Sequence, residues 1–163
     1  MPEGVEDDIV QGMYLLETLG DSAAPRVRIL GSGALLPEAR GAAQQLVDTH
    51  GLQVQVYSVT SYTELARNNQ DHQRETLIQA QTQAQATSCH VSTLLNEEEW
   101  GGAPVIAVSD YVKALPEQLR AAINAPLRVL GTDGFGRSDT REKLRAFFEV
   151  DSRFIQYLSL IHI

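Results

Sequence analysis

The stretch LRVLGTDGFGRSDTREKLRAFFEV, Leu127–Val150, carries the clearest fold signal in the chain. Its first residues, Leu127, Val129 and Leu130, form a short apolar run of the kind found in buried strands. The turn that follows, Thr132–Gly136, contains two glycines, which adopt backbone angles that other residues reach only at an energetic cost. We therefore predict a buried strand that ends in a tight, glycine-rich turn.

A capped helix is predicted directly after this turn. Ser138 or Asp139 can accept hydrogen bonds from the first free amides of a helix, and Asp139 with Glu142 has the spacing of a capping box. An apolar stripe at helical spacing includes Leu144 and Phe148. The whole stretch thus predicts one strand, one turn and one helix packed on a sheet.

Further strands and helices are predicted upstream of this stretch. Met13–Glu17 and Arg26–Leu30 flank the polar turn Gly20–Pro25, which favours a hairpin. Gln53–Val59 and Val105–Val108 are two more strand-like segments. Between strands, a helix is expected from about residue 37, where a proline suits a first turn, to a glycine stop at residue 51.

The remaining segments are less regular. Ser61 and Glu64 form a capping-box pattern, which predicts a short helix that ends in a loop at Asn68–Asp71. Residues 73–100 include the run QAQTQAQA at Gln79–Ala86, which suits either a helix surface or a mobile loop. Tyr111–Ile123 has helical periodicity with an interruption at proline 116.

Strands therefore alternate with helices, which is typical of a mostly parallel sheet with helices on both faces. The predicted fold class is α/β. We expect a three-layer sandwich whose mostly parallel sheet gains one antiparallel strand from the first hairpin.

Composition excludes several classes of function. The 163 residues, 43% hydrophobic and 21% charged, suffice for one domain with its own core. A net charge of -8 with scattered basic residues argues against binding nucleic acid or an anionic membrane surface, and no apolar run approaches the ~20 residues that span a bilayer. Cys89 is the only cysteine, so no internal disulfide can form, and we expect a reducing, cytoplasmic setting.

Catalytic and metal-binding motifs are absent from the sequence. Gly31–Gly33 follows a predicted strand, but no third glycine completes a dinucleotide fingerprint and no Lys-Ser or Lys-Thr follows, so we interpret it as a structural turn. The histidines lack metal-ligand spacing, and Cys89 has no second cysteine to complete a zinc site. No catalytic, cofactor-binding or metal-binding residue is therefore assigned.

Five residues are candidates for a contact with another domain or subunit: Glu64, Arg67, Asp133, Phe135 and Arg137. An arginine held by a turn can make forked hydrogen bonds to a carboxylate across such a contact. Phe135 lies between two glycines, and an aromatic side chain on a tight turn either packs into its own core or anchors a partner surface. Salt bridges within the domain are the alternative for the charged residues.

Three further stretches accompany Leu127–Val150: MPEGVEDDIVQGMYLLE at Met1–Glu17, LGSGALLPEA at Leu30–Ala39 and YSVTSYTELARNNQDHQR at Tyr57–Arg74. In order and spacing, the four stretches resemble the C-terminal domain of the homodimeric, thiamine-diphosphate-dependent pyruvate dehydrogenases. Residues 75–100 depart from the pattern of that family. The resemblance covers most of the chain and identifies it as a fragment of a longer enzyme.

The resemblance implies a transketolase-like C-terminal domain that braces a homodimer. Enzymes of this family decarboxylate pyruvate and reductively acetylate lipoyl groups of dihydrolipoyl acetyltransferase. The implied cofactors, thiamine diphosphate and magnesium, belong to the full-length enzyme, and we expect this fragment to bind neither and to be inactive alone. A self-standing regulatory or scaffolding α/β module is the alternative.

The resemblance also divides the chain into three expected segments. Residues 1–12 are the tail of a preceding domain or a linker, and residues 13–157 are the transketolase-like domain. The last six residues, LSLIHI at 158–163, resemble the translation of a transposon-end adapter used in sequencing libraries, so we expect them to be read-through. A natural apolar C-terminal strand or helix end is the alternative.

Overall fold

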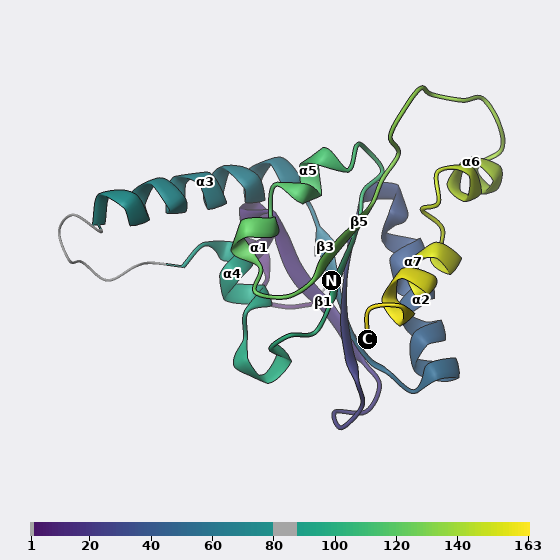
Figure 1. Ribbon diagram of the computed structural model, residues 1–163, viewed down its shortest axis with the longest axis horizontal. Helices are drawn as coiled ribbons and strands as arrows, with labels where there is room; N and C mark the ends of the chain where they lie inside the picture. The colour runs from purple at the N-terminus through teal and green to yellow at the C-terminus, as the bar shows by residue number, and fades with distance from the viewer. Residues whose placement is uncertain (1, 80–87) are drawn as a thin grey trace.

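The computed structural model describes residues 2–79 and 88–163. Its centre is a five-stranded sheet in the order β1-β3-β2-β4-β5 (Figure 1). The strands are β1 (Met13–Leu19), β2 (Arg26–Ser32), β3 (Gln53–Val59), β4 (Val105–Val108) and β5 (Leu127–Leu130). β1 runs antiparallel to β3, and the other neighbouring pairs are parallel. The predicted α/β fold, with a mostly parallel sheet and one antiparallel strand, is confirmed.

The predicted hairpin of the first two strands is wrong. β1 pairs with β3, so that Met13 lies opposite Val59. β2 instead occupies the centre of the sheet between β3 and β4, and its residues Val27 and Ile29 are fully buried. The centre of a parallel sheet is the position most shielded from water, and the apolar β2 takes it. Residues 20–25 therefore connect two strands that are not neighbours.

Two helices, α2 (Leu36–His50) and α7 (Ser152–Leu160), cover one face of the sheet (Figure 1). Four positions on one side of α2 are buried against the strands: Ala39, Ala42, Ala43 and Leu46. Gly51 ends α2 in the left-handed conformation, with φ 63°, as the sequence predicts.

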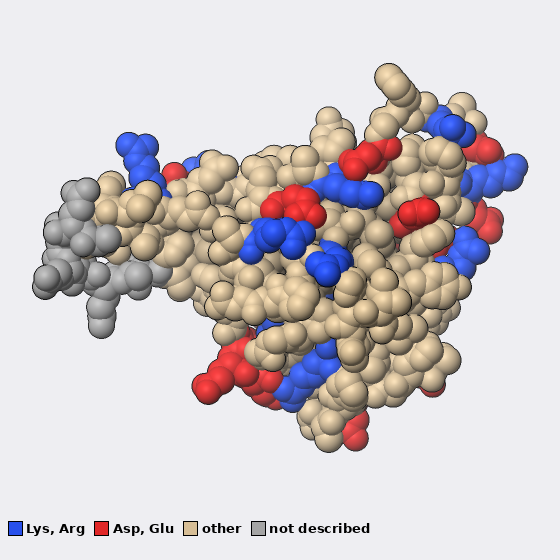
Figure 2. Space-filling model, viewed as in Figure 1, with Lys and Arg blue, Asp and Glu red and all other residues tan. Residues whose placement is uncertain are grey.

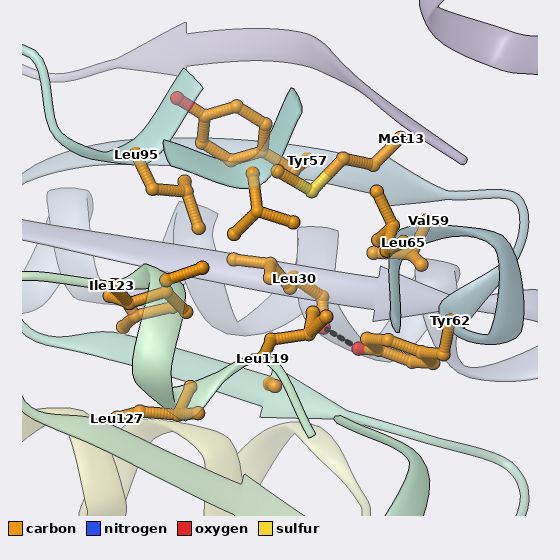
Figure 3. Packing of buried hydrophobic residues seen from close by; sticks show 14 of the residues in the cluster. Met13, Leu30, Tyr57, Val59, Tyr62, Leu65, Leu95, Leu119, Ile123 and Leu127 are labelled. Carbon is orange, nitrogen blue, oxygen red and sulfur yellow. Dashed lines mark hydrogen bonds between the residues drawn. The ribbon is translucent and has the colours of Figure 1, made fainter. Parts of the chain in front are cut away.

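The other face carries α3 (Tyr62–Gln79), α4 (His90–Leu95), α5 (Ala114–Glu117) and the 3-10 turn Arg120–Ala122. Figure 3 shows the core beneath them, where the Tyr62 hydroxyl donates a hydrogen bond to the Leu30 carbonyl at 3.4 Å. The described elements also include the short helix α1 (Glu6–Gln11), α6 (Arg141–Phe147) and 3-10 turns at Gly33–Leu35 and Glu98–Trp100. Helices thus cover both faces, which confirms the three-layer arrangement.

α3 runs through the residues that were expected to form a loop. The Asn68 Oδ1 accepts a hydrogen bond from the His90 amide at 2.9 Å, and the buried Asn69 donates to the Gln118 carbonyl at 3.4 Å. Asparagine predicts turns because it often bonds its own backbone, but here both side chains bond neighbouring segments. Of the run predicted at 79–86, residues 80–86 lie outside the described part of the chain.

The helix start after the glycine-rich turn also differs from the prediction. Thr140, not Ser138 or Asp139, is the N-cap of α6 (Arg141–Phe147), and its hydroxyl accepts a hydrogen bond from the Lys143 amide at 3.4 Å. Asp139 instead accepts a hydrogen bond from the Thr140 amide at 2.7 Å, one residue before the helix. α6 has no fully buried residue, and α7 is the helix that packs on α2.

The segment 111–123 forms α5 and a 3-10 turn instead of one interrupted helix. Pro116 lies in the first turn of α5, where its missing amide costs no helical hydrogen bond. At the C-terminal side, α7 includes the fully buried Ser159. The origin of residues 158–163 and the limits of the three segments stay predictions. Of the described helices, none is both long and apolar enough to cross a membrane.

Candidate functional site

The carboxyl ends of the parallel strands form one edge of the sheet. The chain leaves β2 toward β3 and leaves β4 toward β5, so the connections diverge between β2 and β4. In open α/β sheets, such a reversal of strand order leaves a crevice where ligands bind. The residues that follow β2, β4 and β5 therefore define the candidate site.

Asp110 occupies this reversal point. Its carboxylate accepts long hydrogen bonds, 3.4 Å each, from Ser32 Oγ and the Ala34 amide. Gly33 has φ 50°, and a Cβ at this position would lie 2.4 Å from the Asp110 carboxylate. A Cβ at Gly31 would lie 2.8 Å from an alanine side chain of α2. Close packing therefore explains both glycines, in keeping with a structural turn.

Hydrogen bonds join the loop after β4 to the loop after β5. The Thr132 amide donates to the Tyr111 carbonyl at 2.9 Å, and its hydroxyl donates to the Asp110 carbonyl at 3.1 Å. The Asp133 carboxylate accepts a hydrogen bond from the Lys113 amide at 2.9 Å and lies 3.9 Å from Lys113 Nζ. Asp133, which was predicted to lie at an interface, thus contacts Lys113 of its own domain and holds the base of the loop in place.

The tip of the same loop, residues 134–137, extends away from the sheet. Gly134 has φ 98°, in the region that favours glycine, and the Phe135 side chain is 96% exposed. The Arg137 guanidinium lies 3.8 Å from the ring centroid of Phe147 in α6, a cation–π contact. The Phe135 side chain is therefore not packed in the hydrophobic core of this domain.

Glu64 and Arg67 form an ion pair within α3. Arg67 donates two hydrogen bonds to the Glu64 carboxylate, at 3.1 and 2.5 Å, and this hydrogen bonding lowers the pKa of Glu64. Ser61 Oγ accepts a hydrogen bond from the Glu64 amide at 3.1 Å, so the predicted cap is confirmed. α3 follows β3, which is three strand spacings, about 14 Å, from β5. The structure thus does not bring this pair together with residues 133–137.

A pocket of about 450 Å³ lies between this loop and α6, open to solvent. Figure 2 shows acidic and basic side chains gathered around α6, the region of Figure 1 that holds this loop. The pocket is lined by Leu35, Asp110, Thr132, Gly134, Gly136, Arg137, Asp139, Arg141, Leu144, Arg145, Phe148 and Val150. Three of the five predicted contact residues, Asp133, Phe135 and Arg137, belong to the loop that forms one wall, and of these Arg137 lines the pocket.

Comparison with known proteins identifies the domain. A family model described as the transketolase-like TK C-terminal domain matches residues 12–151. The chain belongs to the transketolase-like C-terminal domain family. Relatives include the pyruvate dehydrogenase E1 components of Escherichia coli, 43% identical over 161 residues, and of Cupriavidus necator, 45% identical over 161 residues. Each match covers 98% of this chain but 17% of the relative, so this chain spans about a sixth of those proteins.

Solved structures place this transketolase-like domain in the same fold. Transketolase from Leishmania mexicana superimposes with a TM-score of 0.59 at 22% identity, covering 98% of this chain and 19% of that one. Transketolase from Campylobacter jejuni gives a TM-score of 0.59 at 19% identity, covering 99% of this chain and 20% of that one. At such identities, the likeness concerns the fold alone.

Three residues near the pocket of the transketolase-like domain were missed from the sequence. Asp110 directly follows the end of a predicted strand, a signal that could have marked it as a residue of the carboxyl edge. Glu38 and Arg145 form an ion pair at 2.6 Å, and Arg145 also donates to the Ala34 carbonyl at 2.8 Å. No local pattern links Glu38 to Arg145, because the chain separates them by 107 positions.

Proposed function

We propose that this domain acts as the C-terminal, dimer-bracing part of a cytoplasmic pyruvate dehydrogenase. The full-length enzyme would decarboxylate pyruvate and reductively acetylate lipoyl groups of dihydrolipoyl acetyltransferase. The observation that carries the proposal is the 43% identity to an E1 component across 98% of the chain. Membership of one domain family does not by itself assign a reaction, so the identity over nearly the whole chain is the stronger support.

Thiamine diphosphate and magnesium would be held by parts of the enzyme outside this domain. Within residues 2–79 and 88–163, no group of three or more His, Cys, Asp or Glu side chains is placed to hold a metal ion. Asn68 and Asn69, whose amide oxygens are chemically suited to magnesium, already bond the His90 amide and the Cys89 thiol. The described residues therefore do not fit this cofactor, and we derive no catalytic step from them.

The proposed bracing role rests on the loop after β5. Its base is hydrogen-bonded through Thr132 and Asp133, while Phe135 at its tip is 96% exposed. An exposed aromatic residue on an ordered turn is the kind of side chain that anchors an interface. The occupant we propose is the second subunit of the homodimer, as the resemblance to homodimeric pyruvate dehydrogenases implies.

Activity measurements test the proposal. The purified 163-residue chain, given thiamine diphosphate, magnesium and pyruvate, should release no carbon dioxide above the rate without protein. The full-length protein, obtained by extending the reading frame into the flanking genomic DNA, should be active under the same conditions. Turnover by the short chain alone would reject the bracing role. A genuine start codon at Met1, with no upstream coding sequence, would contradict the proposal that the chain is part of a longer pyruvate dehydrogenase.

A further inference from the structure

The pocket between the loop after β5 and α6 has the properties of a small-molecule site. Its volume of about 450 Å³ falls within the roughly 300–1,000 Å³ of typical ligand pockets. Leu35, Leu144, Phe148 and Val150 give it an apolar lining. Such a lining favours an apolar body, while a few polar groups fix its orientation.

Two arginines in the pocket lining, Arg137 and Arg141, form no ion pair within the described part of the chain. Among the described residues, six arginines pair with carboxylates, including Arg145, which is bound to Glu38. Arg137 and Arg141 form no salt bridge with any acidic side chain of the described residues. Arg137 uses the face of its guanidinium on Phe147, which leaves the N–H groups in its plane free to donate.

The lining also carries two carboxylates, Asp110 and Asp139, and Asp139 lies 3.6 Å from Lys143 Nζ. Arg137 and Arg141 are therefore the groups of the lining that can give charge-assisted hydrogen bonds to an anion.

The polar groups at the pocket also include Asp110 and Thr132. The Asp110 carboxylate has two hydrogen bonds of 3.4 Å, close to the longest that count as hydrogen bonds. It therefore keeps acceptor capacity for a hydroxyl or amine of a ligand. Asp110 also stands at the reversal of strand order, the position where open α/β sheets bind ligands.

We propose that this pocket binds a small organic anion, with one phosphate or carboxylate group on a compact apolar body. The anionic group contacts Arg137 and Arg141, and the body packs on Leu144 and Phe148. The site goes beyond the bracing role. It shares Arg137 with the proposed dimer contact but leaves the exposed Phe135 side chain free.

Titration of the 163-residue chain tests the site with three probes: phenyl phosphate, benzoate and inorganic phosphate. Calorimetry should show one molecule of phenyl phosphate or benzoate bound per chain, and the tighter of the two identifies the anionic group. In amide NMR spectra, the shifts should centre on Thr132, Leu144 and Val150. Inorganic phosphate should bind at least about tenfold more weakly, because it lacks the body that fills the apolar lining.

Charge variants provide the second measurement. The double variant Arg137→Gln with Arg141→Gln should weaken binding at least about tenfold, since it removes both charge-assisted contacts. Arg74→Gln removes one exposed charge from α3 and should change the affinity less than about twofold. The proposal is overturned if neither organic anion binds, if inorganic phosphate binds equally well, or if the shifts centre elsewhere. If the double variant fails to fold, the location of the amide shifts in the wild-type spectra decides whether the organic anion binds in this pocket.

Discussion

Arg28 and Tyr57 form a polar cluster inside the core. Arg28 of β2 has no exposed surface and donates to the Gln55 side chain at 3.2 Å and to the Leu95 carbonyl at 2.7 Å. The Tyr57 hydroxyl lies 3.0 Å from the same Gln55 oxygen. Burial lowers the pKa of Arg28, and one of its nitrogens lacks a partner among the described residues. The charge of Glu97 opposes this lowering, but Arg28 forms no ion pair among the described residues, so the cluster depends on its hydrogen bonds.

The Tyr57 hydroxyl predicts a loss of stability at alkaline pH. Burial raises its pKa from the ordinary 10.0 to about 12, against the opposing charge of Arg28. A raised pKa means that the folded state holds the proton more tightly. This stabilisation is therefore complete below pH 10 and is lost as the pH rises toward about 12. The difference corresponds to roughly 2–3 kcal/mol.

Urea unfolding between pH 9 and pH 12 checks the prediction. Tyr57→Phe should lose less stability across this window than the wild type, although it starts lower by about 1 kcal/mol for the missing hydrogen bond. Tyr111→Phe, which removes a hydroxyl from a side chain 63% exposed, is the matched control and should follow the wild-type curve. Parallel curves for the wild type and Tyr57→Phe would contradict the assignment.

At the scale of elements, Glu38 connects three helices. From the first turn of α2, one carboxylate oxygen pairs with Arg145 of α6 at 2.6 Å, and the other accepts from the Ser152 amide of α7 at 3.0 Å. The Glu38 and Arg145 side chains are each 20% exposed. Such half-buried, charge-assisted bonds are stronger than surface ion pairs. Glu38 therefore holds the two C-terminal helices against α2.

Glu38→Ala should lower the free energy of unfolding by about 1–3 kcal/mol, because it leaves Arg145 and the Ser152 amide without their partner. Hydrogen exchange should become faster in α6 and α7 and stay unchanged in α3. Glu17→Ala is the matched control: Glu17 pairs with Arg40, which is 57% exposed, so its loss should cost less than about 1 kcal/mol. Equal costs for the two variants would refute the connecting role.

The same elements show how far sequence reasoning reaches. The strands and α2 were predictable because their apolar patterns, and the stop at Gly51, reflect local chemistry. The pairing of β1 with β3 was not predictable from the sequence, because an apolar pattern identifies a strand but does not identify the strand next to it. The roles of Asn69 and Glu38 were not predictable for a related reason. A polar residue that bonds a distant segment has the same local pattern as one in a loop or on a surface. At the candidate site, Phe135 and Arg137 could be located, whereas the pocket depends on contacts between distant positions.

At the scale of the whole molecule, the carboxyl edge combines two surfaces on one loop. The inner side of residues 132–140 lines the pocket, and Phe135 extends from the outer side. The base of the loop is bonded through Asp133 to the segment after β4, so a partner would meet an ordered surface. Ordered interfaces lose less conformational entropy on association, which suits a permanent dimer contact.

Phe135→Ala with Arg137→Ala in the full-length enzyme should therefore weaken dimerisation at least about tenfold, as expected for an aromatic and an arginine anchor. In the isolated chain, the same variant should shift the melting temperature by less than about 2 °C, because Phe135 is 96% exposed and Arg137 contacts only the surface of α6. Sedimentation equilibrium and thermal melts measure the two effects. Glu64→Gln with Arg67→Gln, at the other end of the edge, shows whether the interface extends to α3. A variant that melts much earlier as an isolated chain, yet dimerises normally when full-length, would show that the loop serves its own fold.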